Sequence, residues 1–64
     1  MTPAQCRAAR ALIELSQGEL AGRAGVSARL VADFEAGAVK LRDEDLDAIQ
    51  DALERAGWSS LNAV

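Results

Sequence analysis

The feature that most constrains the fold is a dense series of helix-start and helix-stop signals in the first 37 residues. Thr2 and Gln5 have the spacing of a capping box, in which each side chain bonds the backbone of the other residue. Pro3 stands at the first helical position, where its missing amide hydrogen costs nothing. These residues predict a helix over about 3–14.

The second start signal comes directly after the first helix. Ser16 and Glu19 repeat the capping-box spacing, and Gly25 suits the left-handed residue that closes a helix. We therefore predict a short second helix over about 17–24.

The remaining signals define two more helices. Ser27 is a third cap, and it predicts a helix over about 28–36 before Gly37. After a loop, Asp43 is the expected cap of a longer helix over about 44–56.

Apolar residues recur at helical spacing in the first and last of these helices. Cys6, Ala9 and Ile13, with Leu12 alongside, form one expected core face. The last helix has four apolar residues on one side and its acidic residues off it: Leu46, Ile49, Leu53 and Ala56.

Length and composition agree with this pattern. The chain has 64 residues, half of them hydrophobic, with a single proline and 3% aromatic residues, which favours an all-α fold over a sheet. We expect one compact domain of four to five helices over 1–64, ending in a short apolar tail over 58–64. A domain this small buries only about 60% of its unfolded surface, so we expect a second copy to assist its stability.

The chain lacks the residues on which catalysis and metal binding depend. It has no histidine, and its single cysteine, Cys6, has no partner for a disulfide or a Cys-His nucleophile. We expect Cys6 to pack as a small buried hydrophobe, and we expect neither a cofactor nor an enzyme activity. No apolar run is long enough to span a membrane, and the N-terminus lacks the basic-then-apolar signature of a signal peptide, so we expect a cytoplasmic protein.

The charge of the chain is unevenly distributed. Its net charge is −3. Residues 1–42 contain six basic and four acidic side chains, which gives +2, whereas residues 43–64 contain one basic and six acidic side chains, which gives −5. The local potential matters to a charged partner over about 10 Å, so a mildly basic face can lie beside an acidic one. The acids at the start of the last helix also suit the positive end of its dipole.

The stretch from about Leu12 to Gly37 resembles the helix-turn-helix of the phage repressor and Cro family, which includes many small bacterial regulators of the xenobiotic-response-element type. The resemblance depends on residues at fixed spacings: Gln17, Leu20, Ala21, Gly25, Val26, Ser27, Val31, Phe34, Glu35 and Gly37. It implies a lambda-repressor-like fold and a sequence-specific transcriptional regulator, DNA-associated, of bacterial or phage origin. It also implies that Arg10 of the first helix pairs with Glu35, which would place Glu35 in the scaffold.

The resemblance implies that the third helix enters the major groove of DNA. Its outward face then offers Ala28, Arg29, Ala32 and Asp33 as base-contact candidates. Arg29 suits a bidentate bond to guanine, and the alanines suit thymine methyl groups. Asp33 is left with two readings, an acceptor for cytosine N4 or a negative filter against wrong sequences. A solvated i,i+4 pair between Arg29 and Asp33 is the alternative for both.

Phosphate contacts are expected from polar residues near the starts of the two helices and from the loop after them. The candidates are Ser16, Gln17, Ser27, Lys40 and Arg42. The alternative for Lys40 and Arg42 is a solvated loop.

A domain of this type contacts few base pairs, so the resemblance predicts a homodimer, acting as a repressor, on an inverted-repeat operator. The last helix and the tail are the segments not assigned to the core or the groove, which makes Trp58 and Leu61 candidate dimer contacts. Trp58 can equally close the core of its own chain. The alternative function is a protein-interaction module, such as an antitoxin or phage-derived regulator, whose acidic last helix binds another protein.

Overall fold

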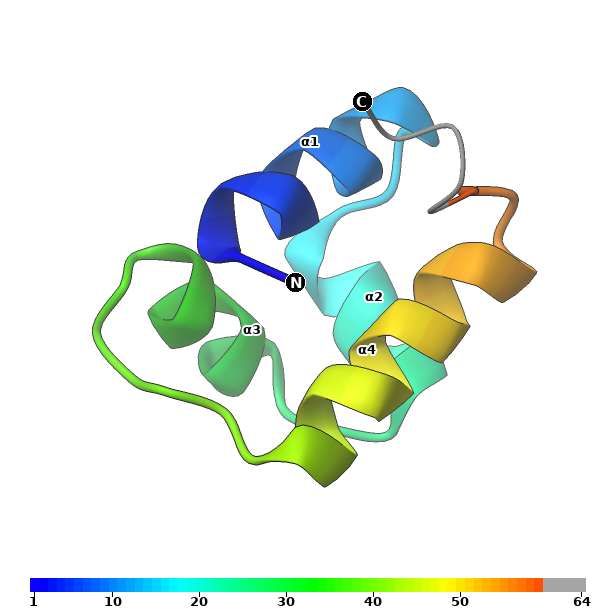
Figure 1. Cartoon of the computed structure of the whole chain (residues 1–64). Helices are drawn as coiled ribbons and strands as arrows, with labels where there is room; N and C mark the ends of the chain where they lie inside the picture. Colours follow the sequence, from blue (N-terminus) through cyan, green and yellow to red (C-terminus); the bar gives the residue numbers. More distant parts are fainter. Residues whose placement is uncertain (60–64) are drawn as a thin grey trace.

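The computed structural model describes residues 1–59, and this part of the chain contains four α-helices and no strand (Figure 1). The helices are α1 (Pro3–Leu12), α2 (Gln17–Ala24), α3 (Ala28–Glu35) and α4 (Asp43–Arg55). Helix α2 packs against both α3 and α4, and α1 packs against α3. The all-α architecture predicted from the helix signals is therefore confirmed.

The predicted capping boxes form at the starts of α1 and α2. The Thr2 hydroxyl accepts a hydrogen bond from the Gln5 amide at 3.1 Å, and the Thr2 amide donates to Gln5 Oε1 at 2.8 Å. The reciprocal bonds between Ser16 and Glu19 are 3.0 and 3.1 Å long. Each box satisfies two backbone amides that a helix start leaves without partners, and this fixes where the helix begins.

The end of α1 differs from the prediction. The helix stops at Leu12, with Ile13 as its cap, and Glu14 takes a left-handed conformation with φ of +54°. Leu12 is 73% exposed, so its placement on the core face was wrong. Helical spacing puts Leu12 about 100° from Ile13 and to one side of Cys6 and Ala9, outside the arc that meets the other helices.

Three further boundaries shift by one residue, one of them the end of α4, which lies at Arg55 instead of Ala56. Helix α3 ends at Glu35 instead of Ala36, and Gly37 follows with φ of +76°. Helix α4 begins at Asp43, which is its first helical residue, and Arg42 takes the cap position without a side-chain cap bond. Asp43 therefore acts on the helix dipole, not as the predicted cap.

The core forms where all four helices meet. Within residues 1–59 it contains twelve buried apolar residues: Cys6, Ala9, Leu15, Leu20, Ala21, Val31, Phe34, Leu41, Ile49, Ala52, Leu53 and Trp58. Helix α4 contributes Ile49, Ala52 and Leu53, so α4 is committed to the core and was wrongly regarded as an unassigned segment. This core holds α2 and α3 in a fixed relation to each other.

Candidate nucleic-acid interface

Helices α2 and α3 are joined by a tight turn at Gly25. Its φ is +75°, a left-handed conformation that glycine adopts without strain. The amide of Val26 donates to the carbonyl of Ala21 at 3.0 Å, and the Ser27 hydroxyl accepts from the amide of Leu30 at 3.0 Å. The chain thus closes α2 and opens α3 within three residues, which is the geometry of a helix-turn-helix.

Helix α3 has one buried side and one solvent-facing side. Val31, Phe34 and Glu35 are buried, whereas Ala28 and Arg29 are exposed and Ala32 and Asp33 are partly exposed. We call the four outward residues Ala28, Arg29, Ala32 and Asp33 the reading face. The four predicted base-contact candidates therefore share one accessible surface of the helix.

Two charged side chains dominate the reading face. The Arg29 side chain is 91% exposed, and its Nε lies 3.8 Å from Oδ2 of Asp33, whose side chain is 42% exposed. The i,i+4 ion pair is therefore present in the free protein. At 3.8 Å it is longer than a direct hydrogen bond, and in water such a pair contributes only a few tenths of a kcal/mol. Arg29 thus keeps its guanidinium accessible to a partner.

The start of α2 presents mixed features to an anion. The amides of Gln17 and Gly18 precede the first intrahelical bond, from the Leu20 amide to the Ser16 carbonyl, and so face outward from the helix end. The Glu19 carboxylate lies at the same end, bonded to the Ser16 amide. The bonds from Ser16 lower the pKa of Glu19, which keeps a negative charge there. A phosphate at this position would contact the amides beside a carboxylate.

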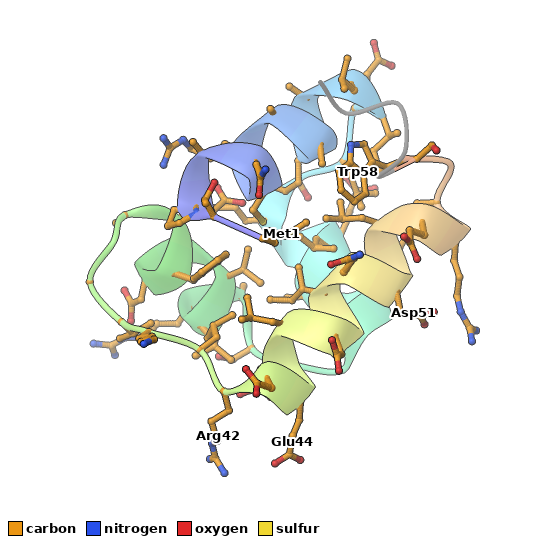
Figure 2. The ribbon with its side chains drawn as sticks, viewed as in Figure 1. Met1, Arg42, Glu44, Asp51 and Trp58 are labelled. Atoms are coloured by element: carbon orange, nitrogen blue, oxygen red, sulfur yellow. The ribbon has the colours of Figure 1, made fainter. Side chains whose placement is uncertain are left out.

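The other phosphate candidates lie on the surface. Ser27 is exposed, and its hydroxyl can still donate while it caps α3. Lys40 and Arg42 are exposed in the segment that joins α3 to α4. Figure 2 shows the Arg42 side chain pointing away from the body of the domain at the start of α4, as Glu44 does. Arg42 is directly followed by the acidic residue Asp43, whereas Lys40 lies three residues before it along the chain.

A buried carboxylate fixes the end of α3 to the rest of the domain. Glu35 is 3% exposed. Arg10 of α1 donates to it through two nitrogens, Nε to Oε2 and Nη2 to Oε1, each at 2.6 Å. A third nitrogen, Nη1, donates to the Leu15 carbonyl at 3.0 Å. The Arg10–Glu35 pair implied by the family resemblance is confirmed, and Glu35 is buried more deeply than the edge of the core.

Further groups converge on Glu35 that the sequence pattern did not reveal. The Gln17 amide nitrogen donates to Oε1 at 3.0 Å, and the Cys6 thiol donates to Oε2 at 3.2 Å. Arg7 of α1 donates to the backbone carbonyl of Glu35. We call Glu35 with Cys6, Arg10 and Gln17 the Glu35 cluster. Because Gln17 is the first residue of α2, the cluster joins the start of α2 and the end of α3 through one carboxylate.

Cys6 and Gln17 have roles that differ from the simple expectations for them. Cys6 is fully buried, as predicted, but it is also a hydrogen-bond donor to a charged group. Gln17, predicted as a phosphate contact, donates one of its side-chain amide hydrogens to Glu35. An amide nitrogen has two hydrogens, so Gln17 can hold Glu35 and still donate the second one outward. No local pattern signals either contact, because both depend on how the helices pack.

The protonation states of the Glu35 cluster follow from its contacts. Burial by itself would raise the pKa of Glu35, but hydrogen bonds from Arg10, Gln17 and Cys6 outweigh it and place the pKa below the ordinary value of 4.5. The bond to Glu35 raises the pKa of Arg10. Burial, followed by the bond to Glu35, raises the pKa of the Cys6 thiol to about 12. At neutral pH the cluster therefore holds a carboxylate, a guanidinium and a neutral thiol.

This arrangement predicts acid sensitivity. A carboxyl whose pKa is lower in the folded than in the unfolded state stabilises the fold above its unfolded pKa, and the contribution is lost as the pH falls through the folded value. We expect the difference in unfolding free energy between the wild type and Glu35→Gln to shrink as the pH drops below about 4.5. Urea titrations at a series of pH values measure it, with Asp47→Asn as the surface control. A difference that stays constant down to pH 3 would contradict the prediction.

Of the two candidate dimer residues, Trp58 and Leu61, only Trp58 lies within the described residues. Trp58 follows α4, is 9% exposed and belongs to the core, and Figure 2 shows its side chain turned toward the rest of the domain. Its own-chain role is thus established. Leu61 lies outside the described residues.

No helix within residues 1–59 is long and apolar enough to cross a membrane. In the same range, no group of three or more His, Cys, Asp or Glu side chains is arranged to hold a metal ion.

Comparison with known proteins agrees with the geometry of α2 and α3. A helix-turn-helix family model, of the Cro and lambda repressor type, matches residues 7–56, which is most of the chain. A search of curated proteins found no significant match. The matched range runs from Arg7 in α1 to the residue after α4, so it contains the reading face and, except for Cys6, the Glu35 cluster. This chain therefore belongs to the helix-turn-helix family of DNA-binding transcription regulators.

Proposed function

We propose that residues 1–64 act as a single helix-turn-helix domain that binds a specific double-stranded DNA sequence as a homodimer and represses transcription by steric block. The observation that carries this proposal is the division of α3 into two sides. One side is fixed to α1 and α2 through Glu35, and the other presents Arg29, whose side chain is 91% exposed.

The reading face suits the floor of the major groove. Its alanines are small enough to let the helix approach the base edges closely and to contact thymine methyl groups. Arg29 is the one side chain of the face that can donate a pair of parallel hydrogen bonds, the arrangement that matches guanine O6 and N7. We infer that Arg29 reads a guanine in each half-site.

Binding strength in this proposal comes from the DNA backbone. Gln17, Ser16 and Ser27 lie at the starts of α2 and α3, where amides and hydroxyls can donate to phosphates. Lys40 and Arg42 add positive charge at the other end of α3. The Glu35 cluster would keep the phosphate-contacting start of α2 in register with the reading face, because one carboxylate bonds both elements.

Two copies are needed for useful specificity. One recognition helix contacts only a few base pairs, whereas two copies on inverted half-sites, about 34 Å apart, double the sequence that is read. Because Trp58 is buried in its own chain, we propose Leu61 as the first candidate for a dimer contact.

Selection from a random duplex library tests the function directly. The full chain, shown to be folded by circular dichroism, is used to enrich duplexes, and the recovered pool is sequenced. An inverted repeat with half-sites one helical turn apart supports both DNA reading and the dimer. A single enriched half-site supports reading by a monomer and contradicts the dimer. An unenriched pool contradicts sequence-specific binding.

Lys40 is expected to contribute affinity without specificity. Lys40→Ala should weaken binding to all duplexes by the same factor and lower the slope of log K against log salt by about one, because one phosphate contact is lost. Titrations of the selected duplex and a scrambled duplex at several salt concentrations measure both quantities. Lys40→Arg keeps the charge and is the matched control. An unchanged slope would assign Lys40 to a solvated loop.

The alternative function is a protein-interaction module, and the observation that favours it is the acidic surface of α4. Asp43, Glu44, Asp47 and Asp51 are exposed there. If folded protein enriches no duplex, a basic protein partner for this surface becomes the favoured proposal.

A further inference from the structure

The ion pair on the reading face joins the only two charged side chains of that surface. Arg29 lies in the first turn of α3 and Asp33 one turn later, and the contact is made by Nε of Arg29 and Oδ2 of Asp33. The neighbouring reading-face residues are alanines, which cannot hydrogen-bond through their side chains. Asp33 is therefore the one reading-face group able to orient the Arg29 guanidinium.

The order of the two charges argues against a role in helix stability. A helix favours acids near its N-terminus and bases near its C-terminus, because of its dipole. Asp51 and Arg55 of α4 follow this order, and their Oδ2 and Nε atoms lie 2.8 Å apart. In α3 the arginine comes first and the acid second, and the separation is 3.8 Å. The α3 pair is thus the reverse of the arrangement that stabilises a helix.

The nitrogen used in the contact determines what the rest of the guanidinium can do. Arginine has five N–H groups in a planar fork. When Nε faces Asp33, the two terminal nitrogens remain at the far end of the plane, where they can donate two parallel bonds to guanine O6 and N7. In the free protein the 3.8 Å contact is longer than a direct hydrogen bond and the Arg29 side chain is 91% exposed, so the carboxylate lies close enough to orient the side chain but does not fix it before DNA binds. The ion pair also strengthens in a groove that excludes water, because screening falls.

We propose that Asp33 is a positioning residue for specificity, which holds Nε of Arg29 so that its terminal nitrogens read one guanine per half-site. This inference rests on the proposed DNA-reading function. It assigns Asp33 to the same base pair as Arg29, and not to a separate cytosine or to general repulsion of phosphates. The Asp33 carboxylate lowers the affinity for any DNA, because it repels phosphates, but it increases the preference for guanine at one position.

The test is a double-mutant cycle with a sequence readout. Asp33→Asn is measured in the wild-type and Arg29→Ala backgrounds, against the selected duplex and variants with each base at every position of one half-site. In the wild-type background we expect the guanine preference to fall about three- to tenfold at the position read by Arg29, and in the Arg29→Ala background we expect no change at that position. Asp33→Glu, which keeps the carboxylate, should restore part of the preference.

The matched control is Asp51→Asn, which removes one carboxylate from an i,i+4 pair of the same residue types on α4. Figure 2 shows Asp51 on the side of α4 away from α3. Its effect on affinity measures the general consequence of losing one negative charge. Melting temperatures confirm that every variant is folded, and because Asp33 and Asp51 are surface residues we expect them to lie within about 4 °C of the wild-type value.

Three results would overturn the inference. Uniformly tighter binding to all duplexes by Asp33→Asn, with preferences unchanged, would mean that Asp33 only repels phosphates. A changed preference at a different base pair, equal in both backgrounds, would mean that Asp33 contacts a base by itself. If the wild type enriches no duplex, the proposed DNA-reading function fails, and the inference that rests on it fails with it. This outcome differs from the other two, in which a selected duplex exists and only the role assigned to Asp33 is wrong.

Discussion

Glu35→Ala should unfold a large share of this protein at physiological temperature. The substitution leaves Arg10, whose side chain is 18% exposed, without the carboxylate to which it donates twice, and it also removes the acceptor of Gln17 and Cys6. Breaking a buried pair by removing one partner costs about 3–5 kcal/mol. A domain of this size is stabilised by only about 0.05–0.15 kcal/mol per residue, so the loss approaches the whole stability.

Thermal and urea unfolding followed by circular dichroism measure the effect. We expect a fall in melting temperature of more than about 10 °C, since each kcal/mol corresponds to about 4–8 °C in a small domain. The melting temperature of Glu35→Gln should lie between those of the wild type and Glu35→Ala. Four donor groups bond the two carboxylate oxygens of Glu35, and the glutamine amide keeps only one of these oxygens. Asp47→Ala, which removes an exposed carboxylate from α4, is the control and should change little.

Glu35→Ala also distinguishes a role of Glu35 in the fold from a role in base recognition. If Glu35 acts only through the fold, the fraction of Glu35→Ala that remains folded, for example with DNA present or at low temperature, should prefer the same base at every position. A melting temperature equal to that of the wild type would remove the Glu35 cluster as a stabilising element. A changed base preference would place Glu35 in the interface.

Arg29→Ala should abolish the preference at one base pair of each half-site. A good bidentate contact between arginine and guanine provides about 1–3 kcal/mol of discrimination, which corresponds to about 5- to 150-fold in relative affinity. Because Arg29 is exposed and bonds no core residue among those described, the fold should be unaffected. Competition binding against duplexes that carry each base at that position measures the loss.

Arg29→Lys is the matched variant for this prediction. Lysine keeps the positive charge but has no planar fork, so the salt dependence should stay as in the wild type while most of the guanine preference is lost. The two variants thus distinguish charge from geometry. An unchanged preferred sequence in Arg29→Ala would show that the outward face of α3 does not read the bases, whatever the affinity.

The helix pattern could be predicted from the sequence because its signals are local. Thr2 and Ser16 each act on a residue three positions away, and a glycine such as Gly25 acts through its own backbone. These short-range interactions form wherever the helices pack. The helix-turn-helix resemblance extended the prediction to the Arg10–Glu35 pair, which the structure confirms.

The tertiary structure decided which side chains share an environment. Cys6 and Glu35 are 29 residues apart, and Gln17 and Glu35 are 18 apart, so their contacts exist only after α1, α2 and α3 have packed. Packing also turned Leu12 outward, against its predicted place on the core face, and buried Trp58 in the core of its own chain, which is one of the two interpretations that the sequence left open. Helix caps and turns thus depend on neighbours along the chain, whereas the carboxylate that joins the two helices of the motif depends on the angles at which the helices meet.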